Sequence, residues 1–120
     1  MRDTKSTNPE LIKLIAFLKK EGREKQANIW IDVASHLSKP SRQRVSVNLS
    51  SINRNTKRAD TIVVPGKILG AGNLAHSVTV AAFDASGKAK EKLALAKAKY
   101  LSIPELVQKN PKGSKVKIIW

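Results

Sequence analysis

Apolar residues recur at helical spacing in the first third of the chain. Between Leu11 and Leu18 they follow the i, i+3, i+4, i+7 pattern, which predicts an amphipathic helix. Asn8-Pro9-Glu10 is a start signal, because Asn caps free N–H groups, Pro fits the first helical position and Glu faces the positive end of the helix dipole. Gly22 is the expected stop of this helix.

The same spacing predicts a second helix, which ends before Pro40 and has Asn28 as its candidate cap. Its apolar face is formed by Trp30, Val33, Ala34 and Leu37. We therefore assign Trp30 to the core rather than to base stacking.

After Pro40 the period becomes two, which indicates strands. They are predicted at residues 45–49, 61–64, 76–83, 100–101 and 116–120. Pro65-Gly66 predicts a type II turn, because glycine supplies the positive φ that this turn requires, and residues 67–69 then begin a return strand. Loops or turns are predicted at residues 70–73, 84–87 and 110–113.

Helical segments alternate with these strands. A short helical turn is predicted at residues 49–53 and a helix at 88–98, while a capping box of Ser102 and Glu105 opens a helix at 103–109. The order predicts an α/β fold of mixed α+β character, with two N-terminal helices followed by an irregular strand–helix sheet core. At 120 residues, we expect one domain over residues 1–120.

Composition excludes several classes of protein. The chain has no cysteine, which excludes a disulfide framework, a thiolate zinc site and a cysteine nucleophile. No apolar run approaches the roughly 20 residues of a membrane span, and the first residues lead into no secretory signal. We expect a cytoplasmic protein that does not associate with membranes.

The net charge is the most informative feature of the composition. The sequence has 23 Lys and Arg against 9 Asp and Glu, a net charge of +14. Residues 1–60 contain 13 basic and 6 acidic side chains, and residues 61–120 contain 10 and 3, so the surplus is not a detachable tail. Such an excess favours a polyanionic partner.

The stretch between Asp32 and Asp60 contains no acidic residue. Its basic residues are Lys39, Arg42, Arg44, Arg54, Lys57 and Arg58. Most of them are Arg, although Lys is commoner in the whole chain, and the planar guanidinium group matches phosphate oxygens in pairs. This window favours nucleic acid over a merely solvated basic surface.

The sequence contains no recognisable catalytic constellation. Gly66, Gly70 and Gly72 do not form a Walker loop, in which the last glycine is followed by Lys and then Ser or Thr at the start of a helix. His36 fits the edge of a core, and His76 fits either a phosphate or base contact or a structural role at a strand edge. We expect no enzyme, metal, cofactor or small-molecule substrate. A phosphate-handling enzyme that uses the glycine loop is the weakest alternative.

Other binding modes fit less well than contacts to the phosphates of folded RNA. The lysine-rich segment 88–99 contains no Trp or Phe for membrane insertion. The five aromatic residues form no RNA-recognition-motif signature, and no helix-turn-helix pattern is clear.

Several motifs resemble one family over nearly the whole chain. They are Thr7–Ile12, Leu37–Arg44 with Val47–Leu49, Val64–Gly70, Val78–Phe83 and Asn110–Ser114. The pattern is similar to the e-type eighteenth protein of the large ribosomal subunit, which archaea and eukaryotes share and which is related to the fifteenth large-subunit protein of bacteria. The short length, without an extended basic C-terminal tail, resembles the archaeal form.

The resemblance implies a structural component of the cytoplasmic ribosome, with large-subunit rRNA and neighbouring ribosomal proteins as partners. It carries basic family positions onto Lys39, Arg42, Arg44 and Lys67, while Ser41 and Ser51 stand where the family is often basic. To these the sequence pattern adds Arg54, Lys57, Arg58 and His76 as candidate RNA contacts. The alternative is a free-standing chromatin-like or regulatory protein that binds nucleic acid.

Overall fold

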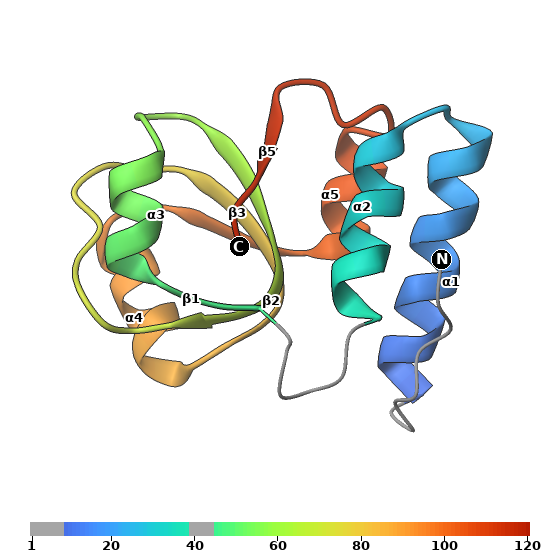
Figure 1. Ribbon diagram of the computed structural model, residues 1–120. Coiled ribbons are helices and arrows are strands. Elements are labelled where there is room, and N and C mark those ends of the chain that lie inside the picture. The colour runs from blue at the N-terminus through green and yellow to red at the C-terminus, as the bar shows by residue number, and fades with distance from the viewer. Residues whose placement is uncertain (1–8, 39–44) are drawn as a thin grey trace.

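The computed structural model describes residues 9–38 and 45–120, and this part of the chain forms five helices around a five-stranded sheet (Figure 1). The helices are α1 (Pro9–Glu24), α2 (Asn28–Leu37), α3 (Leu49–Asn55), α4 (Gly87–Leu95) and α5 (Ile103–Lys109). The strands are β1 (Val45–Asn48), β2 (Thr61–Leu69), β3 (Thr79–Ala85), β4 (Lys99–Ser102) and β5 (Val116–Ile118). The predicted α/β class, with two N-terminal helices ahead of the sheet, is confirmed.

Every strand pair in this sheet is parallel. The order is β1-β2-β3-β4, and β5 also pairs with β2. Because β3 occupies one edge of β2, the other edge is shared: β5 lies beside Thr61–Val63 and β1 beside Gly66–Leu69. All strands therefore run in one direction. The starts of β2, β3, β4 and β5 lie in one row, and β1 starts further along β2, beside Gly66.

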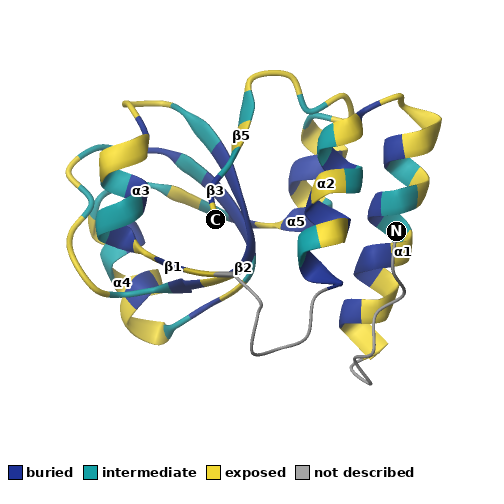
Figure 2. Cartoon of the chain, viewed as in Figure 1, coloured by how far each residue is buried: buried dark blue, intermediate teal, exposed yellow. Residues whose placement is uncertain are grey.

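The sheet separates two apolar cores, because successive strand residues point to opposite faces (Figure 2). Val63 joins the core covered by α1, α2 and α5, and its neighbours Ile62 and Val64 join the core covered by α3 and α4. Trp30 is fully buried in the first core, and its Nε1 donates to the Pro111 carbonyl at 2.7 Å. Its assignment to the core is confirmed.

The turn predicted at Pro65-Gly66 is wrong, because β2 continues through both residues. Gly66 pairs with Val45 of β1, and its φ is not positive. On the β3 side the register shifts between Val64 and Lys67, so this is a β-bulge. A bulge tolerates proline, which has no N–H to give to a ladder. Residues 67–69 therefore extend β2 and start no return strand.

Gly22 does not stop α1, which continues to Glu24. The stop is a Schellman turn in which Ala27 N donates to the Gly22 carbonyl at 2.9 Å and Gln26 adopts a left-handed φ of 54°. Glycine at position 22 serves packing instead. A Cβ there would lie 2.6 Å from Cγ1 of Ile31 on α2.

Other boundaries move by a few residues. Asn28 is the first residue of α2, and its cap is Ala27. The strand predicted at 76–83 runs from Thr79 to Ala85, and the expected turn at 84–87 is replaced by the end of β3 and by Ser86, which caps α4. The capping box of Ser102 and Glu105 is confirmed. The cap predicted at Asn8 and the helix stop predicted at Pro40 lie outside the described residues.

Candidate RNA-binding surface

The predicted basic residues do not form a single cluster in the described part of the chain. Lys39, Arg42 and Arg44 lie outside the described residues. The side chains of Arg54, Lys57, Arg58 and Lys67 are exposed, and that of His76 is half-buried. The structure places four of these residues near the start of β2 and separates Lys67 from them.

The group near the start of β2 is built on the end of α3. Arg54 lies in the last turn of that helix, and Lys57 and Arg58 follow in the turn that leads to β2. This turn also contacts the segment before β3, because Ala59 N donates to the Ser77 carbonyl at 2.8 Å. The cations therefore project from a backbone that is held at both sides.

His76 has a structural contact in this group. Its Nε2 lies 2.8 Å from Thr56 Oγ1, and the same hydroxyl donates to the Ile52 carbonyl at 2.7 Å. Because a hydroxyl has one hydrogen, Nε2 of His76 must be the donor toward Thr56. His76 precedes β3 by three residues rather than opening it, and this contact favours its structural role.

Asp60 organises the turn before β2. Its Oδ2 accepts from the backbone N of Lys57 at 2.8 Å and from Lys117 Nζ at 3.1 Å. The hydrogen bond from Lys57, followed by that from Lys117, lowers the pKa of Asp60. The carboxylate is thus a turn residue that accepts two hydrogen bonds.

Lys67 lies toward the other end of the sheet. It pairs across the strands with Ser46 and Asp84, while the next row, Val47, Ile68 and Ala85, faces the core under α3 and α4. The side chain of Lys67 is therefore on the opposite face. Six residues of strand, roughly 20 Å, separate it from Thr61. Its pairing with Ser46 places Lys67 beside the start of β1.

Four lysines that the sequence pattern did not single out share the strand-start end with Lys57 and Arg58. They are Lys97, Lys99, Lys115 and Lys117, all exposed. Each lies just before or at the start of β4 or β5. Only a parallel sheet brings such starts together, and the expected return strand at residue 67 concealed that arrangement. We call these six residues the basic edge: Lys57, Arg58, Lys97, Lys99, Lys115 and Lys117.

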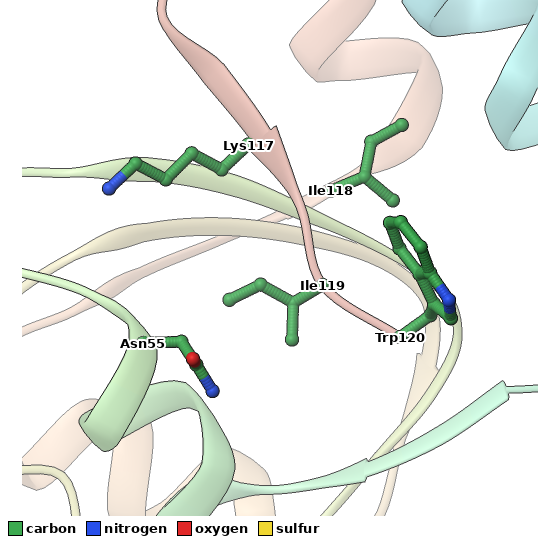
Figure 3. Close-up of a pocket in the computed structure, with 5 residues that line it drawn as sticks. All are labelled: Asn55, Lys117, Ile118, Ile119 and Trp120. Atoms are coloured by element: carbon green, nitrogen blue, oxygen red, sulfur yellow. The ribbon is translucent and has the colours of Figure 1, made fainter.

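An open pocket borders the basic edge (Figure 3). Its volume is about 540 Å³, and it is lined by Asn55, Lys117, Ile118, Ile119 and Trp120. Trp120 was expected to alternate within the closing strand, but β5 ends at Ile118 and the indole is 70% exposed. The Trp120 ring lies 4.9 Å from that of His36, which is half-buried at the core edge as predicted.

The glycine loop at residues 70–73 presents carbonyl oxygens, which do not suit a phosphate ligand. Lys92 Nζ donates to the carbonyls of Gly70 and Gly72 at 2.8 and 2.7 Å. A phosphate-binding loop instead presents N–H groups to its ligand. The loop therefore binds an internal cation, and Lys92 is half-buried rather than part of a solvated helix face.

Residues 9–38 and 45–120 contain no group of three or more His, Asp or Glu side chains that could hold a metal ion. Within the same residues, no helix has both the length and the apolar character that crossing a membrane requires.

The chain is similar to archaeal ribosomal proteins over nearly its full length. It is 48% identical over 119 residues to "Large ribosomal subunit protein eL18" of Methanococcus maripaludis, with 99% of each chain covered. Identity to the proteins of that name is 45% in Methanoregula boonei, with 98% of each chain covered, and 44% in Methanothermobacter thermautotrophicus, with 99% of this chain and 98% of the relative covered. No protein-family model matches the chain. The relatives nevertheless show its family, because identity of this size extends from end to end: the chain belongs to the eL18 family of large ribosomal subunit proteins.

Proposed function

We propose that this protein is a structural, non-enzymatic constituent of the large ribosomal subunit in the cytoplasm. It binds and stabilises folded rRNA and contacts neighbouring ribosomal proteins. The observation that carries the proposal is the near-full-length similarity to proteins named for the large subunit. A net charge of +14 supports it, because rRNA phosphates supply the negative charge that the chain lacks.

The candidate RNA contacts come from two parts of the molecule. One part consists of Lys39, Arg42 and Arg44, which precede β1 in the sequence and lie outside the described residues, together with Lys67, which pairs with Ser46 of β1. The other is the end of α3 with the strand starts beside it, and it consists of Arg54, Lys57 and Arg58; His76, also predicted as a contact, binds Thr56 beside them and has a structural role. Exposure of the described cations supports this assignment, because phosphate contacts require side chains that reach solvent.

Salt dependence of binding tests the proposal. Each neutralised phosphate releases counterions, so log K should fall with log salt by roughly 0.7 to 0.9 per contact. We expect at least about five contacts on large-subunit rRNA freed of protein, and weaker binding to duplex DNA of equal length. A slope near zero would contradict the electrostatic account. Equal affinity for the DNA would favour a free-standing chromatin-like protein instead.

A further inference from the structure

We infer that the basic edge is a phosphate-binding surface for rRNA that extends from the start of β2 to the starts of β4 and β5. The inference rests on the proposed function and adds a surface to it. Four of the six residues, Lys97, Lys99, Lys115 and Lys117, come from the second half of the chain, far in sequence from the acid-free window.

Strand register brings these cations together. Val116, Thr61, Thr79 and Lys99 form one row across β5, β2, β3 and β4. Neighbouring strands lie about 4.8 Å apart, so this row spans about 14 Å. Each residue of the basic edge lies in this row or within four positions of it along the chain. The residues belong to the starts of β2, β4 and β5 or to the segments just before them. The topology thus concentrates charge that is scattered along the sequence.

Little negative charge offsets the basic edge. In the segments that carry the strand starts, residues 57–61, 76–79, 97–99 and 115–117, Asp60 is the one carboxylate. It already accepts hydrogen bonds from the Lys57 backbone and from Lys117. Lys117 keeps 55% of its side chain exposed despite that contact. The remaining cations repel one another and favour an anionic partner.

The backbone under two of these lysines is unusual. Lys97 and Lys115 adopt left-handed φ values of 58° and 61°. Lys97 occupies the position of a Schellman turn that glycine normally takes, since Ala98 N donates to the Leu93 carbonyl and Lys97 N to the Ala94 carbonyl, both at 3.0 Å. A lysine in the left-handed region raises the free energy of the folded state by about 1 kcal/mol or more. The turn fixes the backbone from which the lysine side chain projects.

RNA fits this surface better than an acidic protein does. The centre of a protein interface is enriched in aromatic and other large apolar side chains, whereas nucleic-acid surfaces are polar and strongly positive. The exposed large apolar residues in the described chain are Ile12, Leu95 and Trp120, and the segments of the basic edge contain none of them. Lys67 lies roughly 20 Å further along β2 and is therefore not part of this surface.

Matched charge variants test the inference. The edge variant carries Lys97→Gln, Lys99→Gln and Lys115→Gln, and the control carries Lys13→Gln, Lys20→Gln and Lys25→Gln at exposed positions in or just after α1. Glutamine is suited to position 97, because Gln26 holds the equivalent place in the turn after α1. Both variants lose three positive charges, so long-range attraction changes equally.

Binding is measured on protein-free large-subunit rRNA as a function of salt. We expect the edge variant to bind more weakly than the control, with a salt slope less steep by about 2, as three lost contacts require. If the wild-type chain binds and the two variants lose affinity equally, the basic edge is not a contact surface and only the inference fails. If the wild-type chain does not bind, the proposed function fails.

Directed cleavage of RNA gives an independent readout. The chain has no cysteine, so Lys97→Cys, Lys115→Cys and Lys13→Cys each create a unique attachment point for an iron chelate that cleaves nearby RNA. Positions 97 and 115 should cut the same limited stretch of rRNA, and position 13 should cut little. The inference is overturned if positions 97 and 115 cleave rRNA no more strongly than position 13 does. It is also overturned if an acidic protein, and not rRNA, protects the basic edge.

Discussion

Gly72 lies where the chain passes close to α3 in a left-handed conformation, with φ of 86°. A Cβ at this position would lie 2.5 Å from Ser50 Cβ and 2.9 Å from the Ser50 nitrogen. We expect Gly72→Ala to lower the free energy of unfolding by about 2–4 kcal/mol, because backbone strain and the displacement of α3 both contribute. Urea denaturation measures this loss.

Gly87 provides the matched control. It opens α4, and a Cβ there would meet no atom within 4 Å. Gly87→Ala should leave the free energy of unfolding unchanged or raise it by about 0.5–1 kcal/mol, because alanine reduces the freedom of the unfolded chain. Losses of similar size at the two positions would refute the close approach described for Gly72.

Tyr100 gives a titration that is simple to read, since the sequence has one tyrosine. Burial raises the pKa of its phenol above the ordinary value of 10.0, and the charge of Asp84 adds to the effect. Tyrosinate absorbance should therefore appear at higher pH in the folded protein than in urea. Identical midpoints in the two states would contradict the burial described for this side chain.

The same shift of the Tyr100 pKa has a consequence for stability. The folded state favours the neutral phenol, so this contribution is complete below the unfolded pKa and is lost as pH rises toward the folded pKa. Stability should fall more steeply above pH 10.0 in the wild-type chain than in Tyr100→Phe. Parallel curves of unfolding free energy against pH would show that Tyr100 contributes nothing.

Helix caps differ in what their side chains do. The hydroxyls of Ser86 and Ser102 accept from Ala89 N and Glu105 N, at 3.1 and 3.3 Å. Asn48 occupies the same position before α3 without such a bond. We expect Ser86→Ala and Ser102→Ala each to cost about 1 kcal/mol of stability, measured by chemical denaturation. Asn48→Ala should cost clearly less, and an equal cost would mean that these hydrogen bonds do not stabilise the helices.

Helices and strands that are specified by residues close together in the sequence are predicted correctly from it. The capping box before α5, the amphipathic face of α1 and the alternation in β1 each lie within a few neighbouring residues, so the sequence shows them directly. Pro65-Gly66 does not form the predicted turn, because the conformation of these two residues is set by the neighbouring strands β1 and β3. Gly66 fits between two strands at a bulge, and no neighbour in the sequence reports that contact.

The sequence predicts only those members of the candidate site that lie close together along the chain. Arg54, Lys57 and Arg58 stand close together in the sequence, and the structure keeps them at one end of the sheet. Lys97 and Lys115 join that end only through parallel pairing of strands 18 or more residues apart. Such convergence depends on sheet order, which periodicity does not reveal.

At the scale of the whole molecule, basic residues lie at both ends of one sheet. Lys67 lies near the end of β2, and the basic edge lies at the start of that strand. Helices cover both faces between them (Figure 1). The sheet therefore sets the spacing between Lys67 and the basic edge, roughly 20 Å along β2.

The two arginines before β1 should matter more for RNA binding than two lysines of α4. Paired guanidinium donors on a short junction lose less freedom on contact than lysines on a helix surface. Arg42→Ala with Arg44→Ala should therefore weaken rRNA binding more than Lys88→Ala with Lys90→Ala. Both pairs remove two charges, and thermal melting establishes first that both variants fold. Equal losses of affinity would mean that only total charge counts.

Association with the intact subunit tests the central claim most directly. The measurement is the sedimentation of the protein with large ribosomal subunits from a cell lysate, before and after a high-salt wash. If several phosphate contacts hold the protein, they must break together for release, so we expect the protein to sediment with the large subunit and to remain there after the wash. Recovery in the free fraction, or with DNA, while other large-subunit proteins stay bound would contradict the account.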